Sequence, residues 1–153
     1  MNKKTDFGFE SLNIQEKTDK VSSLFQDVAP HYDFMNDMMS LGLHRCWKKS
    51  FLSHLALRPQ QKILDIAGGT GDIAEGIFTR CQKENFNSSV ILTDINPAML
   101  KKGAKRWLDK GHITGPQRIE ANAETLPFPN NHFDICTIAF GLRNITYKDK
   151  IIK

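Results

Sequence analysis

The chain has 153 residues, the size of one domain, and its 40% hydrophobic and 25% charged residues are ordinary for a soluble globular protein. No apolar run approaches the roughly 18 residues of a membrane-spanning helix, and the N-terminus lacks the apolar core of a secretory signal. The formal net charge of +4 comes from scattered Lys and Arg, which solvated helix faces explain as well as an RNA or lipid partner would. The charge alone does not decide between these partners, and no nucleic-acid partner is expected. The three cysteines are far apart and predict reduced thiols in a cytoplasmic protein, with no metal site: Cys46, Cys81 and Cys136.

Two amphipathic helices are predicted before the first strand. Within 16–28 and again within 44–57, apolar residues recur at the period of an α-helix, and Pro30 and Pro59 end the two segments. The second helix is expected to bury one stripe of side chains: Trp47, Phe51, Leu52 and Leu55. Together these helices form a predicted N-terminal helical cap, residues 1–58.

From residue 59 onward, strands and helices alternate. Strands are predicted at 62–66, 90–93, 118–121 and 134–140, with helices at 72–81 and 97–110. Asn96 and Pro97 form a strong helix start, and Gly111 suits the position just after the helix. A further helix is expected to begin after Thr146. This alternation predicts an α/β domain with a parallel, doubly wound sheet.

A glycine-rich loop follows the first of these strands. Residues 65–72 read Asp-Ile-Ala-Gly-Gly-Thr-Gly-Asp, a composition that lets the backbone turn sharply and approach a ligand closely. Gly69, Gly71 and Ala74 also fit the dinucleotide fingerprint G-x-G-x-x-G/A, and Asp94 lies about 20 residues further on, as a ribose-binding acid should. A NAD(P)-binding domain is therefore one interpretation.

Asp72 argues against that interpretation. At the start of a helix, its carboxylate would compete with a pyrophosphate for the free N–H groups and would repel the phosphates. S-adenosylmethionine has no phosphate and carries a sulfonium and an ammonium group. The carboxylates of Asp65, Asp72 and Asp94 would give a negative site suited to such a cation, with Asp94 binding both ribose hydroxyls.

Several segments resemble one enzyme family. Residues 32–47 read Tyr-Asp-Phe-Met-Asn-Asp-Met-Met-Ser-Leu-Gly-Leu-His-Arg-Cys-Trp. This run resembles the Tyr-Asp-x-Met-Asn…Ser…His-x-x-Trp signature of the UbiE-type ubiquinone/menaquinone C-methyltransferases, which are class I S-adenosylmethionine-dependent enzymes. The likeness extends from about residue 5 to residue 153 and includes three further stretches: Phe7-Gly8-Phe9, 67–72, and 140–144, which reads Phe-Gly-Leu-Arg-Asn.

The resemblance implies roles for particular residues. It implies that S-adenosylmethionine is bound by Gly69, Thr70, Asp94, Asn122 and Ala123, and that no metal takes part. It implies that Arg143 and Asn144 are catalytic and act on a polyprenyl benzoquinol or naphthoquinol at the membrane surface. A homodimer or a quinone-biosynthesis complex, and a location in the cytoplasm or peripheral to the inner membrane, are implied in the same way. His44 is open to two interpretations, an assisting group or a packed side chain.

The chain departs from the family pattern in two residues and in length. Ala139 stands where the family usually has Ser, and Tyr147 where Asp is common. The family's Rossmann-like sheet has seven strands in the order 3-2-1-4-5-7-6, and only the first four are predicted here, in a partial cofactor-binding α/β domain at 59–153. We therefore expect the chain alone to be poorly stable and inactive. The alternatives are a non-catalytic remnant of such an enzyme and a methyltransferase of another small molecule or of RNA, for which no substrate motif is present.

Overall fold

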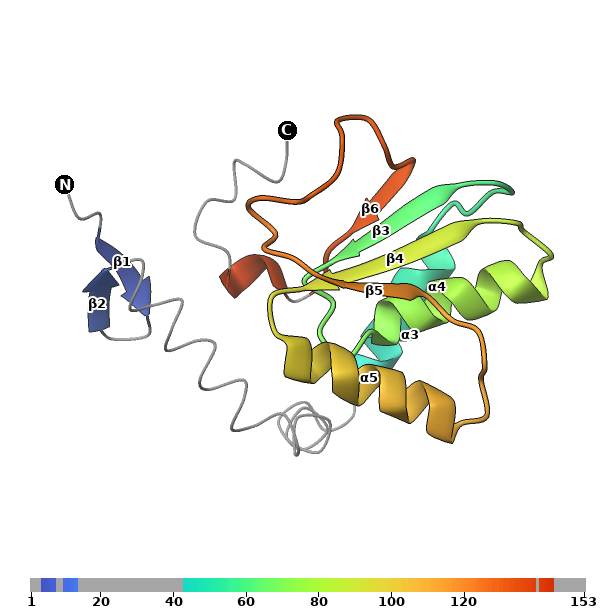
Figure 1. Cartoon of the computed structure of the whole chain (residues 1–153), viewed down its shortest axis with the longest axis horizontal. Helices are drawn as coiled ribbons and strands as arrows, with labels where there is room; N and C mark the ends of the chain where they lie inside the picture. The colour runs from blue at the N-terminus through green and yellow to red at the C-terminus, as the bar shows by residue number, and fades with distance from the viewer. Residues whose placement is uncertain (1–3, 8–9, 14–42, 140, 145–153) are drawn as a thin grey trace.

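The structure is a computed structural model that describes residues 4–7, 10–13, 43–139 and 141–144, with the backbone alone for residues 4–7, 10–13, His44, Arg143 and Asn144. Figure 1 shows a short N-terminal hairpin and an α/β unit. The elements in chain order are β1 (Lys4–Phe7), β2 (Glu10–Asn13), α3 (Leu43–His54), β3 (Lys62–Ile66), α4 (Asp72–Lys83), β4 (Ser89–Asp94), α5 (Pro97–Asp109), β5 (Gln117–Glu120), β6 (Ile135–Thr137) and the 3-10 helix η2 (Gly141–Asn144).

The larger sheet is parallel and has the strand order β5-β4-β3-β6. The chain therefore winds from β3 outward to β5 and then crosses to the other side of β3. In open α/β sheets, ligands bind outside the carboxyl ends of the strands at the point where the strand order reverses. The predicted parallel α/β sheet is confirmed, and its order matches the first four positions of the family's 3-2-1-4 arrangement.

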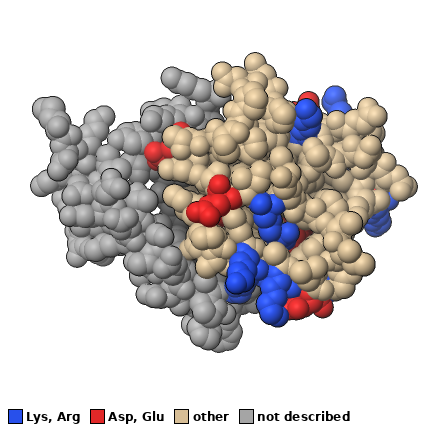
Figure 2. Space-filling model, in the orientation of Figure 1, with Lys and Arg blue, Asp and Glu red and all other residues tan. Residues whose placement is uncertain are grey.

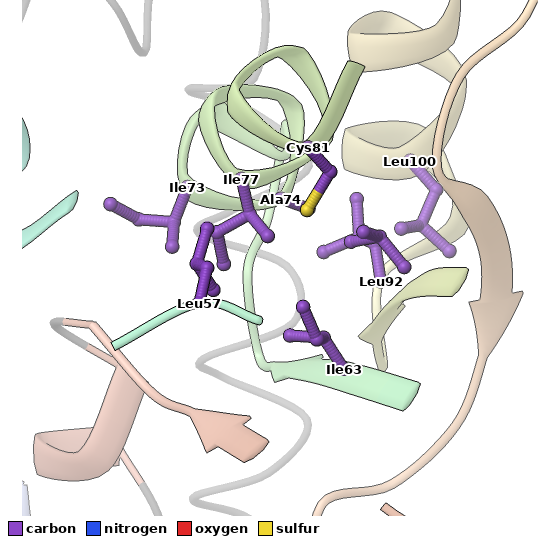
Figure 3. Packing of buried hydrophobic residues seen from close by; sticks show 9 residues of the cluster. Leu57, Ile63, Ile73, Ala74, Ile77, Cys81, Leu92 and Leu100 are labelled. Carbon is purple, nitrogen blue, oxygen red and sulfur yellow. The ribbon is translucent and has the colours of Figure 1, made fainter. Parts of the chain in front are cut away.

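Helices α3, α4 and α5 lie on one face of this sheet (Figure 1). Figure 3 shows the apolar cluster between them, to which Ile63 and Leu92 contribute from the strands, Ile77 and Cys81 from α4, and Leu100 from α5. Burying an aliphatic side chain of this size contributes about 1.5–3 kcal/mol. This packing fixes β3, β4 and the starts of α4 and α5 relative to one another.

The ends of α5 agree with the sequence signals. The Asn96 side chain accepts hydrogen bonds from the N–H groups of Ala98 at 2.9 Å and Met99 at 3.4 Å, and Pro97 is the first helical residue. Gly111 has a φ of 83°, and its N–H donates to the Leu108 carbonyl at 2.8 Å. The predicted cap and the predicted terminating glycine are both confirmed.

Helix α3 is shorter than predicted and exposes part of its predicted apolar stripe. It ends at His54, because the Arg80 guanidinium of α4 donates to the carbonyls of Leu52 at 2.8 Å and Leu55 at 2.9 Å and so satisfies the last turn. Leu52 and Leu55 pack against the core as expected, but Trp47 is 56% exposed and Phe51 36%. The prediction that all four are buried is wrong, since α3 meets α4 along a narrower face.

Two further differences concern strands. Sequence periodicity did not predict the antiparallel hairpin of β1 and β2, in which Lys4 pairs with Asn13 and Phe7 with Glu10. The strand predicted at 134–140 extends only over Ile135–Thr137, because β3, its neighbour, ends at Ile66 and its pairing stops where Asp65 faces Thr137. The helix predicted at 16–28, most of the 32–47 motif and the helix after Thr146 lie outside the described residues.

The Arg80 contact yields a stability prediction. Arg80→Met removes the guanidinium donor from two carbonyls at the end of α3, each of which keeps one backbone N–H donor. It is expected to destabilise the chain by about 0.5–1.5 kcal/mol, measured by urea denaturation. Glu84→Gln is the control, because it removes only the exposed Arg80–Glu84 ion pair and should cost less than about 0.5 kcal/mol. Equal losses in the two variants would contradict a capping role for Arg80.

Candidate cofactor-binding site

The segments that follow the four parallel strands meet at the carboxyl edge of the sheet. The Gly68 N–H donates to the Thr93 carbonyl at 3.1 Å, and the Ala121 N–H donates to the Asp94 carbonyl at 3.0 Å. Gly141 lies so close to the glycine loop that a Cβ there would be 2.7 Å from the Cβ of Ala67. The loops after β3, β4 and β5 and the start of η2 therefore form one continuous edge, as the sequence pattern predicted.

The glycine loop needs its glycines at two places. Gly71, which immediately precedes α4, has a φ of 92°, and a Cβ there would also lie 2.7 Å from Leu92 Cδ2. Gly68 passes directly over a buried carboxyl, because a Cβ at this position would be 2.4 Å from Asp65 Oδ2. Ala67 has a φ of 51°, a left-handed conformation that is unusual for a residue with a side chain and is often found at functional sites.

Asp94 is held against this loop. Its Oδ2 accepts a hydrogen bond from the Gly69 N–H at 2.8 Å, and its Oδ1 accepts one from the Asn96 N–H at 2.9 Å. Burial raises the pKa of the Asp94 carboxyl above its ordinary value, and these N–H groups oppose that rise. Each carboxylate oxygen keeps a further lone pair, so Asp94 can still accept two hydrogen bonds from a ligand.

Asp65 differs from the other acids of the site. It lies in β3 with no exposed surface, its Oδ1 accepts a hydrogen bond from the Thr137 hydroxyl at 2.7 Å, and its Oδ2 has no hydrogen-bond partner among the described residues. Burial raises its pKa to about 7; the Thr137 hydroxyl opposes the rise and the charges of Asp94 and Asp72 add to it. Asp65 therefore holds a proton in a substantial fraction of molecules near neutral pH.

Asp72 is paired with cations from two other helices. Its carboxylate forms an ion pair with Lys48 of α3 and a second one with Arg106 of α5 at 2.5 Å. Burial alone would raise the pKa of Asp72, but the two cations overcome this and hold the pKa below its ordinary value. The expectation that Asp65, Asp72 and Asp94 together give a negative site therefore needs correction, because Asp72 is paired with two cations and Asp65 is partly protonated.

The charged side chains have a clear arrangement on the visible face of the molecule. Figure 2 shows Lys and Arg gathered over α5, with acidic side chains toward the carboxyl edge of the sheet. Sequence reasoning treated the basic residues of this helix as a solvated surface. Lys105 is exposed as expected, whereas Arg106 is turned inward onto α4.

The remaining predicted cofactor residues lie along the same edge. Thr70 is buried in the loop, and its hydroxyl accepts a hydrogen bond from Arg106 at 3.4 Å. Asn122 is exposed after β5, and its side chain accepts the Glu124 N–H at 2.9 Å, as in an Asx turn. Ala123 is half-buried beside it. The structure thus brings Gly69, Thr70, Asp94, Asn122 and Ala123 to one edge.

Arg143 and Asn144 are the last two residues of η2, which begins with Gly141 at the same edge. Their side chains, like that of His44, lie outside what the structure describes.

Sequence reasoning missed the network behind the loop. Glu75, buried in α4, accepts hydrogen bonds from Arg106 at 3.0 Å and from Arg118 of β5 at 2.9 Å. One signal was available, since Asp72 and Glu75 are three residues apart and so share a helix face. The cations that meet this face come from three other elements, which no local pattern connects.

The protonation of Asp65 yields a pH prediction. The folded chain binds this proton more tightly than the unfolded chain, so the free energy of unfolding should fall as pH rises from about 4 to about 7 and then level off. Asp65→Asn cannot ionise and should be more stable than the wild type above about pH 7, by up to about 4 kcal/mol for about three pKa units. Near pH 4, where Asp65 is protonated in the folded wild type, its ionisation should make little difference between the free energies of unfolding of the two proteins.

The measurement is urea denaturation between pH 4 and pH 8. Asp109→Asn is the control, because it removes an exposed carboxylate at the end of α5 and should keep the wild-type pH profile. A profile for Asp65→Asn that runs parallel to the wild type would show that Asp65 is ionised throughout.

Three comparisons with known proteins bear on this site. A profile of the ubiE/COQ5 methyltransferase family matches residues 13–153. The ubiquinone/menaquinone biosynthesis C-methyltransferase UbiE of Francisella tularensis subsp. holarctica is 48% identical over 151 residues, which are 99% of this chain and 59% of the relative. The UbiE of Coxiella burnetii is 51% identical over 144 residues, 94% of this chain and 56% of the relative. The chain thus spans less than two thirds of the length of these relatives.

A solved structure is similar in fold. A protein from Methanococcus maripaludis, described as a putative S-adenosyl-L-methionine-dependent methyltransferase, superposes with a TM-score of 0.61 at 12% identity, over 81% of this chain and 54% of that one. At this identity the likeness concerns the fold alone, and it agrees with the Rossmann-like sheet described above. The profile and the relatives go further, and they show that the chain belongs to the UbiE/COQ5 methyltransferase family.

Proposed function

We propose that the chain binds S-adenosylmethionine at the carboxyl edge of its sheet and serves the C-methylation of a polyprenyl benzoquinol or naphthoquinol in ubiquinone or menaquinone biosynthesis. The observation that carries the proposal is the bond from the Gly69 N–H to Asp94, which sets a carboxylate across the mouth of the glycine loop. Family membership supports the reaction class, and the names of the relatives support the quinol substrate.

The residues present suit this cofactor. Asp94 would accept the two ribose hydroxyls, the loop backbone at Gly69 and Thr70 would contact the rest of the nucleoside and the amino-acid portion, and Asn122 with Ala123 would border the adenine. Of Asp65, Asp72 and Asp94, Asp94 is the one that pairs with no cation among the described residues and is not shifted to a pKa of about 7. A carboxylate at this position that no described cation compensates suits a ligand that combines positive groups with a ribose.

A nicotinamide dinucleotide is the rival ligand for such a loop. Its pyrophosphate would require the N–H groups at the start of α4, where Asp72 is the first helical residue. Lys48 and Arg106, the nearby cations, are already engaged with the Asp72 carboxylate. A phosphate would therefore have to break those ion pairs, and S-adenosylmethionine would not.

When bound, S-adenosylmethionine would supply an electrophilic methyl group to a ring carbon of the quinol and leave as S-adenosylhomocysteine, and that ring carbon would lose its proton to restore the aromatic ring. The ring must be reduced, since a quinone carbon is not nucleophilic, and loss of a hydroxyl proton would activate it further. Arg143 keeps its positive charge in proteins, so its proposed role is to stabilise the phenolate or to orient a water that takes the proton. Asn144 would bind the other ring oxygen, and holding the two reactants together supplies the remaining rate enhancement.

A membrane-associated location is part of the same proposal. Among the described residues, no helix combines the length and the apolar character needed to cross a bilayer. A polyprenyl quinol is nonetheless held in lipid by its tail, so the proposed place of action is the membrane surface, reached from the cytoplasm. Association with a second copy or with a quinone-biosynthesis complex stays a prediction from the family resemblance.

Calorimetric titration tests the cofactor. The chain should bind S-adenosylmethionine and not NADH, and Asp94→Ala should weaken the binding about 10- to 100-fold, because hydrogen bonds to a charged group contribute about 1.5–3 kcal/mol. Asp109→Ala is the matched control, since it removes an exposed acid at the far end of α5 and should leave the affinity unchanged. Tight NADH binding would contradict the proposal.

Transfer of labelled methyl groups to a reduced short-tailed quinol tests the catalytic assignment. The same assay tests the expectation that the chain alone is inactive. If the wild type does transfer methyl groups, Arg143→Met should lower kcat about 10²- to 10³-fold, the usual effect of removing one group that stabilises developing charge, while the affinity for S-adenosylmethionine stays within about twofold. Arg58→Met removes the same charge from an exposed position ahead of β3 and is the control. Cofactor binding without transfer to any quinol would favour the non-catalytic alternative.

A further inference from the structure

Arg106 of α5 contacts the glycine loop at Thr70, on the side of the loop that faces the helices. From the inner face of α5 it donates to the Thr70 hydroxyl through one guanidinium nitrogen and to the Thr70 carbonyl through the other, each at 3.4 Å. The same guanidinium pairs with Asp72 at 2.5 Å and Glu75 at 3.0 Å in the first turn of α4. One side chain thus joins the loop to the helix that follows it.

Helix α5 also touches the loop through its backbone. A Cβ at Gly103 would lie 1.9 Å from the Thr70 carbonyl oxygen, so only glycine permits this approach. Gly103 and Arg106 are three residues apart on one helix face, and both reach Thr70. The loop therefore rests on α5 at the residue that lies between its two left-handed glycines, Gly69 and Gly71.

The guanidinium is itself held in place from three directions. Lys48 of α3 shares Asp72 with it, and Arg118 of β5 shares Glu75 with it at 2.9 Å. The Glu75 side chain is only 6% exposed, so the acceptors of Arg106 have little freedom. The orientation of Arg106, and through it that of Thr70, depends on α3, α4 and β5 together.

From these contacts we infer that Arg106 is a positioning residue for the cofactor: it fixes the Thr70 segment of the loop in the conformation that binds the ligand. The inference rests on the proposed function, because it assumes that this loop holds S-adenosylmethionine. Arg106 acts through Thr70 and does not contact the methyl group. Replacing Arg106 should therefore weaken the binding of S-adenosylmethionine and that of its demethylated product, S-adenosylhomocysteine, by the same factor.

Two variants separate positioning from stability. Arg106→Met removes every contact, and we expect both a lower Tm and a Kd raised about tenfold for both ligands. Arg106→Lys keeps a cation for Asp72 and Glu75 but cannot also reach both oxygens of Thr70 with a planar fork. Its Tm should recover most of the way to wild type, while its Kd stays raised about tenfold.

Lys105→Met is the matched control. It removes the same charge from the adjacent position of α5, where the side chain is 77% exposed and pairs only with Asp109 among the described contacts. Its Kd for either ligand should stay within about twofold of wild type. Affinities are measured by calorimetry at a temperature where circular dichroism shows each variant folded, and they are scaled to the folded fraction.

The outcomes distinguish this inference from the proposed function. A wild-type chain that binds neither ligand would overturn the proposed cofactor and this inference with it. A wild type that binds, with both Arg106 variants binding equally well, would overturn the inference alone. A Kd for Arg106→Lys that recovers together with its Tm would show that Arg106 supports the fold and nothing more.

Discussion

The ion pairs of Asp72 determine how the cofactor edge is assembled. Asp72 begins α4 immediately after the glycine loop, and its carboxylate is shared between Lys48 of α3 and Arg106 of α5. A single acid therefore draws three helices together behind the loop. Glu75, one turn further along α4, extends the same arrangement to β5 through Arg118. Because these charges are partly buried, removing one partner leaves another without compensation, and the cost is higher than for a surface pair.

The parts of the fold that follow from local signals could be predicted from the sequence. The Asn96 cap with Pro97 fixed the start of α5 to the residue, and the alternation of strands and helices gave the parallel sheet. The family resemblance and the parallel topology both predict that Gly69 and Asp94 lie together at the carboxyl edge of the sheet, and the structure joins them by a hydrogen bond. These features succeed because each depends on a few neighbouring residues or on a backbone rule that holds across α/β proteins.

The parts that depend on contacts between distant residues could not be predicted. Arg80 ends α3 early by donating to the carbonyls of Leu52 and Leu55, which are 28 and 25 residues away in sequence, and no pattern within α3 signals this. Arg106 and Lys105 look alike in the sequence, yet one lies in the charge network behind the loop and the other faces solvent. Helical spacing predicts which apolar residues share one face of α3, but it does not predict how much of that face the neighbouring helix covers. Trp47 was therefore expected to be buried and is exposed.

Taken together, the acids of the edge have three different electrostatic states. Asp72 is compensated by two cations, and Asp65 is buried beneath Gly68 with a pKa of about 7, so neither presents a full free charge to a ligand. Asp94 is oriented by neutral N–H groups, which fix its position without cancelling its charge. Of these three acids, Asp94 at the end of β4 therefore presents the most negative charge to a ligand. A ligand that places hydroxyl groups there, carries positive groups and has no phosphate matches this charge distribution. A dinucleotide matches it less well, because its pyrophosphate needs the start of α4.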